Sequence, residues 1–136
     1  MELYRATIPG EPVPKGRPRL GRNGRTYTPA KTIKWEKEAA WALRENVPAS
    51  GLDQPLELHV DVYCSRPKSH SRKRRAAREA KSTKPDGDNF LKAVCDALEK
   101  SGVVVNDSRI WSMSVRKWWC GEDDEPRVDV KLLVAD

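Results

Sequence analysis

Alternation of apolar and polar residues predicts four strands in this chain. The segment 56–64, LELHVDVYC, alternates strictly and places Leu56, Leu58, Val60, Val62 and Cys64 on one face. This is the pattern of a strand with one buried face. Shorter or less regular alternation predicts further strands over 2–8, 109–119 and 126–134.

Helical periodicity predicts two main helices. Between Asn89 and Lys100 the apolar residues recur at i, i+1, i+4, i+7 and i+8, and they are Phe90, Leu91, Val94, Ala97 and Leu98. Gly102 is placed to end this helix. A second helix is predicted over about 29–46, with an apolar stripe made of Ile33, Ala40, Trp41 and Leu43 or Val47. At this spacing Trp35 and Trp41 are interpreted as core residues, with base stacking as the alternative.

The order of these elements predicts an α+β fold. It consists of a single layer of mixed, largely antiparallel sheet with two main helices packed on one face. A chain of 136 residues has the size of one domain, which is predicted to span 1–136. No apolar run approaches the ~18–20 residues that span a bilayer, and charged residues stand where a signal peptide would be apolar. Three cysteines without CxxC spacing fit a reducing compartment, so a cytoplasmic protein is expected.

Positive charge is concentrated in two segments. Residues 15–34 contain seven Lys/Arg and no acid, and residues 66–84 contain nine Lys/Arg and one acid, so the rest of the chain is net negative although the whole carries +6. This separation predicts a surface that binds a polyanion, whereas two flexible basic loops without a partner are the alternative. The residues predicted to contact DNA are Lys15, Arg17, Arg19, Arg72, Lys73, Arg74, Arg75 and Lys84.

The two basic segments differ in predicted structure. The first contains an Asn-Gly turn followed by a β-prone piece, so it is a ribbon or a basic loop. The second has almost no apolar residues and cannot enter a core. It is predicted to be an exposed arm with a short helix at 71–80, disordered until it binds its partner.

The stretch 84–107, KPDGDNFLKAVCDALEKSGVVVND, carries the candidate chemistry. Asp86 and Asp88 flank a glycine in a predicted extended lead-in to the helix, so their carboxylates would project to the same side. Capping of the helix by Asp88 or Asn89 is the alternative, and it leaves Asp86 unexplained.

Three further residues of this stretch extend the candidate site. Lys92 and Asp96 continue the line of the aspartate pair along the helix as an ordinary i, i+4 pair. Asp107 follows a short valine run that could return the chain beside the helix start. It is either a turn residue or a third carboxylate.

Carboxylates beside basic segments favour a metal-dependent nuclease. Mg²⁺ prefers hard oxygen ligands and commonly takes a few carboxylates together with substrate phosphate and water. Lys92 could hold the scissile phosphate or neutralise charge in the transition state. A non-catalytic basic DNA-binding protein is the alternative, and an adaptor that uses the acidic turn 121–125 is a third interpretation.

Two segments resemble the RusA family of Holliday-junction resolvases. They are KPDGDNFLKAVCDAL followed by VVVND, and PVPKGRPRLGRNGRTYTP near the amino terminus. The resemblance covers nearly the whole chain in element order. It implies a homodimeric, Mg²⁺-dependent endonuclease that binds four-way DNA junctions and makes paired, symmetric nicks. Whether Mn²⁺ substitutes for Mg²⁺ is left open by the resemblance. Such proteins act in DNA recombination and repair and are commonly borne by phages.

The resemblance also assigns roles to single residues. Asp86, Asp88 and Asp107 would be catalytic carboxylates that bind the metal, Lys92 would be the catalytic lysine, and Asp96 would be a supporting acid. The chain departs from the family pattern at two positions. Asn106 replaces the first member of an acidic pair and leaves Asp107 as the second, and Phe90 stands where leucine is usual.

Overall fold

The computed structural model describes residues 1–48 and 50–135. Seven strands are present among these residues: β1 (Glu2–Pro9), β2 (Arg19–Leu20), β3 (Thr26–Tyr27), β4 (Leu56–Cys64), β5 (Glu79–Ala80), β6 (Ile110–Trp119) and β7 (Arg127–Val134). The helices are α1 (Ala30–Leu43), α2 (Arg72–Arg75) and α3 (Gly87–Ser101), with short 3₁₀ turns η1 (Arg44–Asn46) and η2 (Asp107–Arg109).

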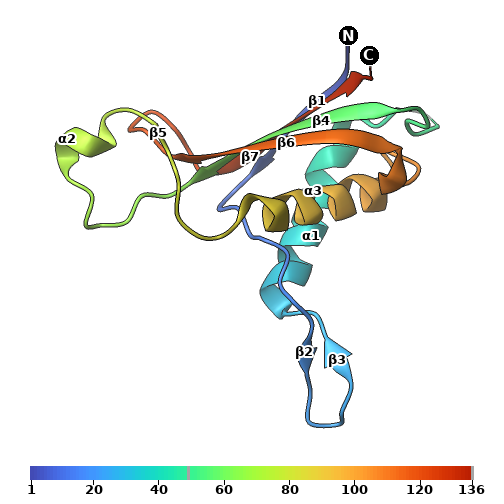
Figure 1. The fold of residues 1–136 in the computed structure, drawn as a ribbon, viewed down its shortest axis with the longest axis horizontal. Helices are drawn as coiled ribbons and strands as arrows, with labels where there is room; N and C mark the ends of the chain where they lie inside the picture. The colour runs from blue at the N-terminus through green and yellow to red at the C-terminus, as the bar shows by residue number, and fades with distance from the viewer. Residues whose placement is uncertain (49, 136) are drawn as a thin grey trace.

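Five strands form one sheet in the order β1-β7-β4-β6-β5. β4 and β6 are parallel, and α3 lies between them in the chain, whereas every other neighbouring pair in this sheet is antiparallel. The predicted α+β fold with a mixed, largely antiparallel sheet is therefore confirmed. The chain termini lie close together at one end of the sheet, because β1 and β7 pair along nearly their whole length (Figure 1).

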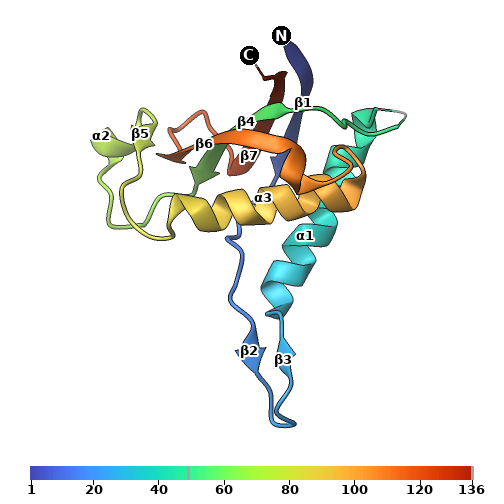
Figure 2. The same cartoon turned by 45° about the vertical axis from the view of Figure 1, so that its right-hand side comes forward.

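Helices α1 and α3 cover the same face of the sheet (Figures 1 and 2). The core between them is made of alternate strand residues, such as Val60 and Leu132, packed against helix residues such as Phe90 and Leu98. The Tyr4 hydroxyl donates a 2.6 Å hydrogen bond to the Leu43 carbonyl and so joins β1 to the end of α1. These contacts fix α3, which carries most of the candidate site residues.

The apolar stripe predicted for the first helix is partly wrong. Trp41 is 75% exposed and Ile33 is 39% exposed. The buried face of α1 consists instead of Thr32, Trp35, Ala39, Ala40 and Leu43. α1 packs against both β1 and α3, and these two neighbours determine which of its faces is buried. The interpretation of Trp35 as a core residue is confirmed, because it is 5% exposed.

Two extensions leave the body of the molecule. The strands β2 and β3 form a separate two-stranded ribbon that projects beyond α1 (Figures 1 and 2). The segment around α2 lies beyond one end of the main sheet, which it joins through the short edge strand β5 (Figure 1). No helix within the described ranges is long and apolar enough to cross a membrane.

Candidate active site

One face of α3 lines a pocket of about 400 Å³. Residues of the helix at i, i+3, i+4, i+7 and i+8 form its floor, and the amino-terminal segment, η2 and β6 complete it. The lining residues are Lys15, Asp88, Leu91, Lys92, Cys95, Asp96, Asp107 and Met113. Three of the four predicted catalytic residues, Asp88, Lys92 and Asp107, therefore open onto the same space, and Asp96 and Lys15 line it as well. The fourth, Asp86, is not among the lining residues.

The start of α3 differs from the predicted lead-in. The helix begins at Gly87, so Asp88 lies in its first turn and not in extended chain. Asp86 occupies the capping position, with φ −69° and ψ 147°, but its side chain makes no capping hydrogen bond. The alternative in which Asp88 or Asn89 caps the helix is therefore wrong. Both aspartate side chains are exposed to solvent.

Asp107 reaches the pocket from the other end of the helix. Gly102 ends α3 in the left-handed region at φ +86°, and the chain turns back through the buried Val103 and Val104. The side chain of Asn106 then accepts a 2.9 Å hydrogen bond from the Ser108 amide and caps the turn η2 that begins at Asp107. The amide at position 106 thus has a structural role in this chain.

The negative charge of Asp107 acts on a buried thiol of α3. Burial raises the pKa of Cys95 to about 11, and the negative charges of Asp107 and Asp96 add to this effect. Asp107 and Cys95 line the same pocket as Asp88.

Asp96 pairs with a lysine other than the predicted one. Its carboxylate lies 2.8 Å from the ammonium of Lys15, which also contacts Glu36 at 2.7 Å. The predicted Lys92–Asp96 ion pair is absent from the described part of the chain. Lys92 remains exposed beside the pocket, whereas Lys15, one of the predicted DNA contacts, is held by two carboxylates.

The pocket provides oxygen ligands but no complete metal cage. Among residues 1–48 and 50–135, no group of three or more His, Cys, Asp or Glu side chains is arranged to hold a metal ion. Asp88 and Asp107 nevertheless present hard oxygen donors to one cavity. This donor set fits Mg²⁺ in kind, because Mg²⁺ is usually bound through one or two carboxylates, water and substrate phosphate.

A second cavity of about 500 Å³ lies on the opposite, open face of the sheet. Its carboxylates are already engaged within the chain. Asp61 accepts hydrogen bonds from Arg116 and Trp118, and Asp129 accepts from Thr7 and Arg127. This cavity therefore lacks the uncommitted acids that distinguish the pocket on α3.

The amino-acid sequence is similar to those of known proteins. The model of the family described as "Endodeoxyribonuclease RusA" matches residues 9–133. The chain belongs to the RusA endodeoxyribonuclease family. It is 33% identical to an uncharacterized protein of Bacillus subtilis (strain 168), YqaN, over 97% of this chain and 96% of the relative. It is 31% identical to the crossover junction endodeoxyribonuclease RusA of Aquifex aeolicus (strain VF5), over 86% of this chain and 79% of the relative.

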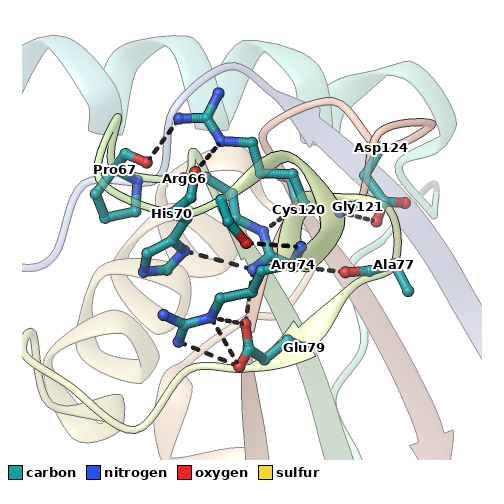
Figure 3. A network of polar contacts seen from close by, with 11 residues as sticks. Arg66, Pro67, His70, Arg74, Ala77, Glu79, Cys120, Gly121 and Asp124 are labelled. Carbon is teal, nitrogen blue, oxygen red and sulfur yellow. Dashed lines mark hydrogen bonds and ion pairs between the residues drawn. The ribbon is translucent and has the colours of Figure 1, made fainter.

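The basic arm of this RusA-family chain is held by one arginine. Figure 3 shows Arg66 surrounded by residues of the arm and of the turn after β6. Its guanidinium, with a side chain only 6% exposed, donates to the Cys120 carbonyl at 2.8 Å, to Glu79 at 2.6 Å and to the Ala77 carbonyl. The predicted helix at 71–80 is shortened to α2, and the arm is ordered by contacts within the chain, contrary to the expectation that order requires a partner.

Apart from Lys15, the predicted DNA contacts of the RusA-family chain fall into two groups. Arg74 pairs with Glu79, and Arg75 donates to the carbonyls of residues 67, 68 and 70. Arg72, Lys73 and Lys84 on the arm, and Arg17 and Arg19 on the ribbon segment, are exposed and have no side-chain partner within the described residues. The second group is the one whose charge is available to phosphate.

Sequence reasoning missed three apolar residues of the pocket. Leu91, Cys95 and Met113 line it together with the acids and lysines. The helical spacing from Asp88 could have identified Leu91 and Cys95, because they lie three and seven residues further on. Met113 could not be identified in this way, since its place depends on the packing of β6 beside α3.

Proposed function

We propose that this protein is a Mg²⁺-dependent endodeoxyribonuclease that resolves four-way DNA junctions by paired, symmetric nicks, in recombination and repair. The observation that carries the proposal is the pocket in which Asp88, Asp107 and Lys92 meet, in a chain of an endodeoxyribonuclease family. The similarity to the Aquifex relative, a crossover junction endodeoxyribonuclease, supports a branched substrate.

The residues of the pocket suit phosphodiester hydrolysis. In this reaction water adds to phosphorus and the bond to the 3′ oxygen breaks, leaving a 3′ hydroxyl and a 5′ phosphate. Asp88 and Asp107 would hold Mg²⁺, with Asp86 beside them at the helix start. When bound, Mg²⁺ supplies Lewis-acid stabilisation of the charge on the phosphoryl oxygens. Lys92 would donate hydrogen bonds to the same phosphate and neutralise part of its charge.

The apolar surroundings of Lys92 would strengthen its interaction with a phosphate. Leu91, Cys95 and Met113 give the pocket an apolar lining. Electrostatic interactions between Lys92 and a phosphate are stronger beside such a surface than in open water, because the local dielectric constant is lower. The lining would also displace part of the bulk water around a bound phosphate.

The two extensions would hold the DNA around this pocket. Arg17 and Arg19 lie on the segment that leads into the β2–β3 ribbon and along it, and a two-stranded ribbon has the dimensions to enter a major groove. The exposed Arg72, Lys73 and Lys84 of the arm would add further phosphate contacts. A homodimer is proposed because a four-way junction is symmetric and paired nicks require two active sites.

Cleavage of a synthetic four-way junction tests the proposal. The wild-type protein is expected to nick two opposing strands at symmetric positions when Mg²⁺ or Mn²⁺ is present, and to be inactive in EDTA. Asp88→Asn and Asp107→Asn are each expected to lose about 100-fold or more in rate, while Asp123→Asn, at an exposed position remote from the pocket, remains active. Sedimentation should give twice the monomer mass of 15.4 kDa.

Two results would contradict the proposal in different ways. Salt-dependent junction binding without cleavage under any metal would identify a non-catalytic DNA-binding protein. Unpaired nicks on any duplex would identify a general endonuclease and would remove the specificity for junctions.

A further inference from the structure

Two lysines hold the loop that leads into the candidate active site. The ammonium of Lys81 donates to the Thr83 carbonyl at 3.2 Å, to the Thr83 hydroxyl at 2.9 Å and to the Lys84 carbonyl. The ammonium of Lys117, on β6, donates to the carbonyls of Thr83 and Pro85, both at 2.8 Å. Three consecutive carbonyls of the loop are therefore held by two side chains, here called the lysine clamp (Lys81 and Lys117).

Lys81 is buried, and both its backbone and its side chain are held by contacts within the chain. The residue is only 7% exposed, and its backbone amide donates to the Lys117 carbonyl at 2.9 Å. Its ammonium lies 4.5 Å from the centre of the Trp119 ring, in cation–π contact. Three oxygen acceptors match the three N–H donors of an ammonium group. Lys81 therefore has no donor left for a DNA phosphate.

A second contact fixes the chain immediately after the clamp. A Cβ atom at Gly87 would lie 2.7 Å from Cγ1 of Val115, so the helix start lies directly against β6. Val115 and Lys117 are two residues apart on that strand and point to the same face. Pro85 is held by Lys117 and Gly87 by Val115, and Asp86 is the one residue between these two anchored positions.

We infer that Lys81 and Lys117 are positioning residues that set where Asp86 and Asp88 stand relative to the pocket. The inference rests on the proposed nuclease function. A loop whose three carbonyls were hydrated would let the helix start shift, and misplacement of a reacting group by about 1 Å can cost about 100-fold in rate. The clamp holds the backbone from inside the molecule and does not touch substrate.

Substitutions of Lys117 test the inference with the intact protein. Lys117→Met keeps the aliphatic stem but removes the donors, Lys117→Arg keeps donors and charge, and Lys100→Met removes one exposed charge from the opposite end of α3 as the control. Amide hydrogen exchange of residues 82–89 is expected to accelerate about tenfold or more in Lys117→Met only. The turnover number for a four-way junction with Mg²⁺ should fall about 10- to 100-fold, with KM little changed, and Lys117→Arg should recover part of the loss.

The salt dependence of junction binding, measured without divalent metal, separates positioning from a phosphate contact. Removal of a lysine that neutralises one phosphate lowers the slope of log K against log salt by about 0.9. An unchanged slope with reduced turnover supports the inference. A slope lowered by this amount overturns it, and so does hydrogen exchange of residues 82–89 that stays at the wild-type rate.

These outcomes can be distinguished from failure of the proposed function. If the wild-type protein cuts no DNA, the nuclease proposal fails, and hydrogen exchange alone then decides whether the clamp holds the segment around Asp86 and Asp88. Lys81→Met serves as the second variant if Lys117→Met does not fold. It is expected to accelerate exchange in the same residues.

Discussion

Lys15 and Asp96 form an ion pair of 2.8 Å that ties the amino-terminal segment to the pocket face of α3. The same ammonium lies 2.7 Å from Glu36 of α1, so Lys15 joins three parts of the chain at one point. This residue lies in the basic segment predicted to contact DNA, but its charge is already offset by two carboxylates. The pair therefore supports the wall of the pocket.

Lys15→Met is expected to destabilise the protein by about 1–2 kcal/mol, because it leaves two carboxylates without their charged donor. Asp96, followed by Glu36, raises the pKa of Lys15 above its usual 10.5. The contribution is thus fully present below pH 10.5 and is lost as the pH rises through the higher folded-state pKa. Urea unfolding at pH 7 measures it, with the exposed Lys31→Met as control. Equal stability of the two variants would show that the ion pair contributes nothing.

Gly87 is expected to tolerate no side chain while Val115 is present. Gly87→Ala would place its Cβ 2.7 Å from Cγ1 of Val115, and such overpacking typically costs about 1–3 kcal/mol. Alanine is otherwise favoured over glycine in a helix by up to about 1 kcal/mol, so a net loss of stability identifies the steric conflict. Junction cleavage should fall as well, because the substitution lies between Asp86 and Asp88.

The matched double variant decides the cause of that loss. Val115→Ala removes the atom that conflicts, so Gly87→Ala combined with Val115→Ala should be more stable than the sum of the single effects by about 1 kcal/mol. Additive effects in urea unfolding would mean that the helix start does not depend on this contact.

The sequence predicts the elements of this fold better than it predicts the site. The periodicity of Phe90, Val94 and Leu98 identifies α3 within two residues at its start and one at its end, because one apolar face must be buried. Trp41 is exposed despite its apolar character, because the packing of α1 against β1 and α3 determines which of its faces is buried. The local sequence of the helix does not show how it packs against these two elements.

The site itself depends on contacts between distant residues. Asp88 lies in the first helical turn because the chain at Gly87 packs against Val115, which is 28 positions away in the sequence. The arm 66–84 looks disordered from its composition, yet Arg66 orders it through carbonyl groups that any sequence would provide. The composition shows that the arm lacks apolar residues, but it cannot show which backbone carbonyls Arg66 will bind.

Stability is expected to decrease at alkaline pH because of two buried thiols. Burial is the main cause that raises the pKa of Cys64 and of Cys95 from 9.0 to about 11. The folded state therefore keeps its proton where the unfolded chain loses it, so stability is fully present below pH 9 and is lost between pH 9 and about 11. The loss should be on the order of 1–2 kcal/mol for each thiol.

Urea unfolding between pH 8 and 11 measures this loss. A Cys64→Ala and Cys95→Ala double variant should show a shallower decrease. The remainder is due to Cys120 and Tyr4, because burial raises the pKa of both and brings that of Tyr4 to about 12. Identical pH dependence in the wild type and the double variant would show that neither thiol ionises on unfolding.

Arg66 and Arg72 are expected to give opposite results although both lie in the basic arm. Arg66→Met removes the donor that holds Glu79 and the carbonyls of Cys120 and Ala77, so it should cost about 2–3 kcal/mol. Hydrogen exchange across the arm should accelerate with it. Arg72 is exposed on α2, and Arg72→Met should change stability by less than about 0.5 kcal/mol.

For DNA binding, Arg72→Met should have the larger effect and Arg66→Met the smaller one. Arg72→Met is expected to lower the salt slope of junction binding by about 0.9, because one phosphate contact is lost. Arg66→Met should leave the slope nearly unchanged when it is measured below the unfolding temperature of that variant, since its guanidinium faces Glu79 and carbonyl groups within the chain. A lowered slope for Arg66→Met with unchanged stability would mean that Arg66 leaves its internal partners to bind DNA, and the arm would then be a segment that reorganises on the junction.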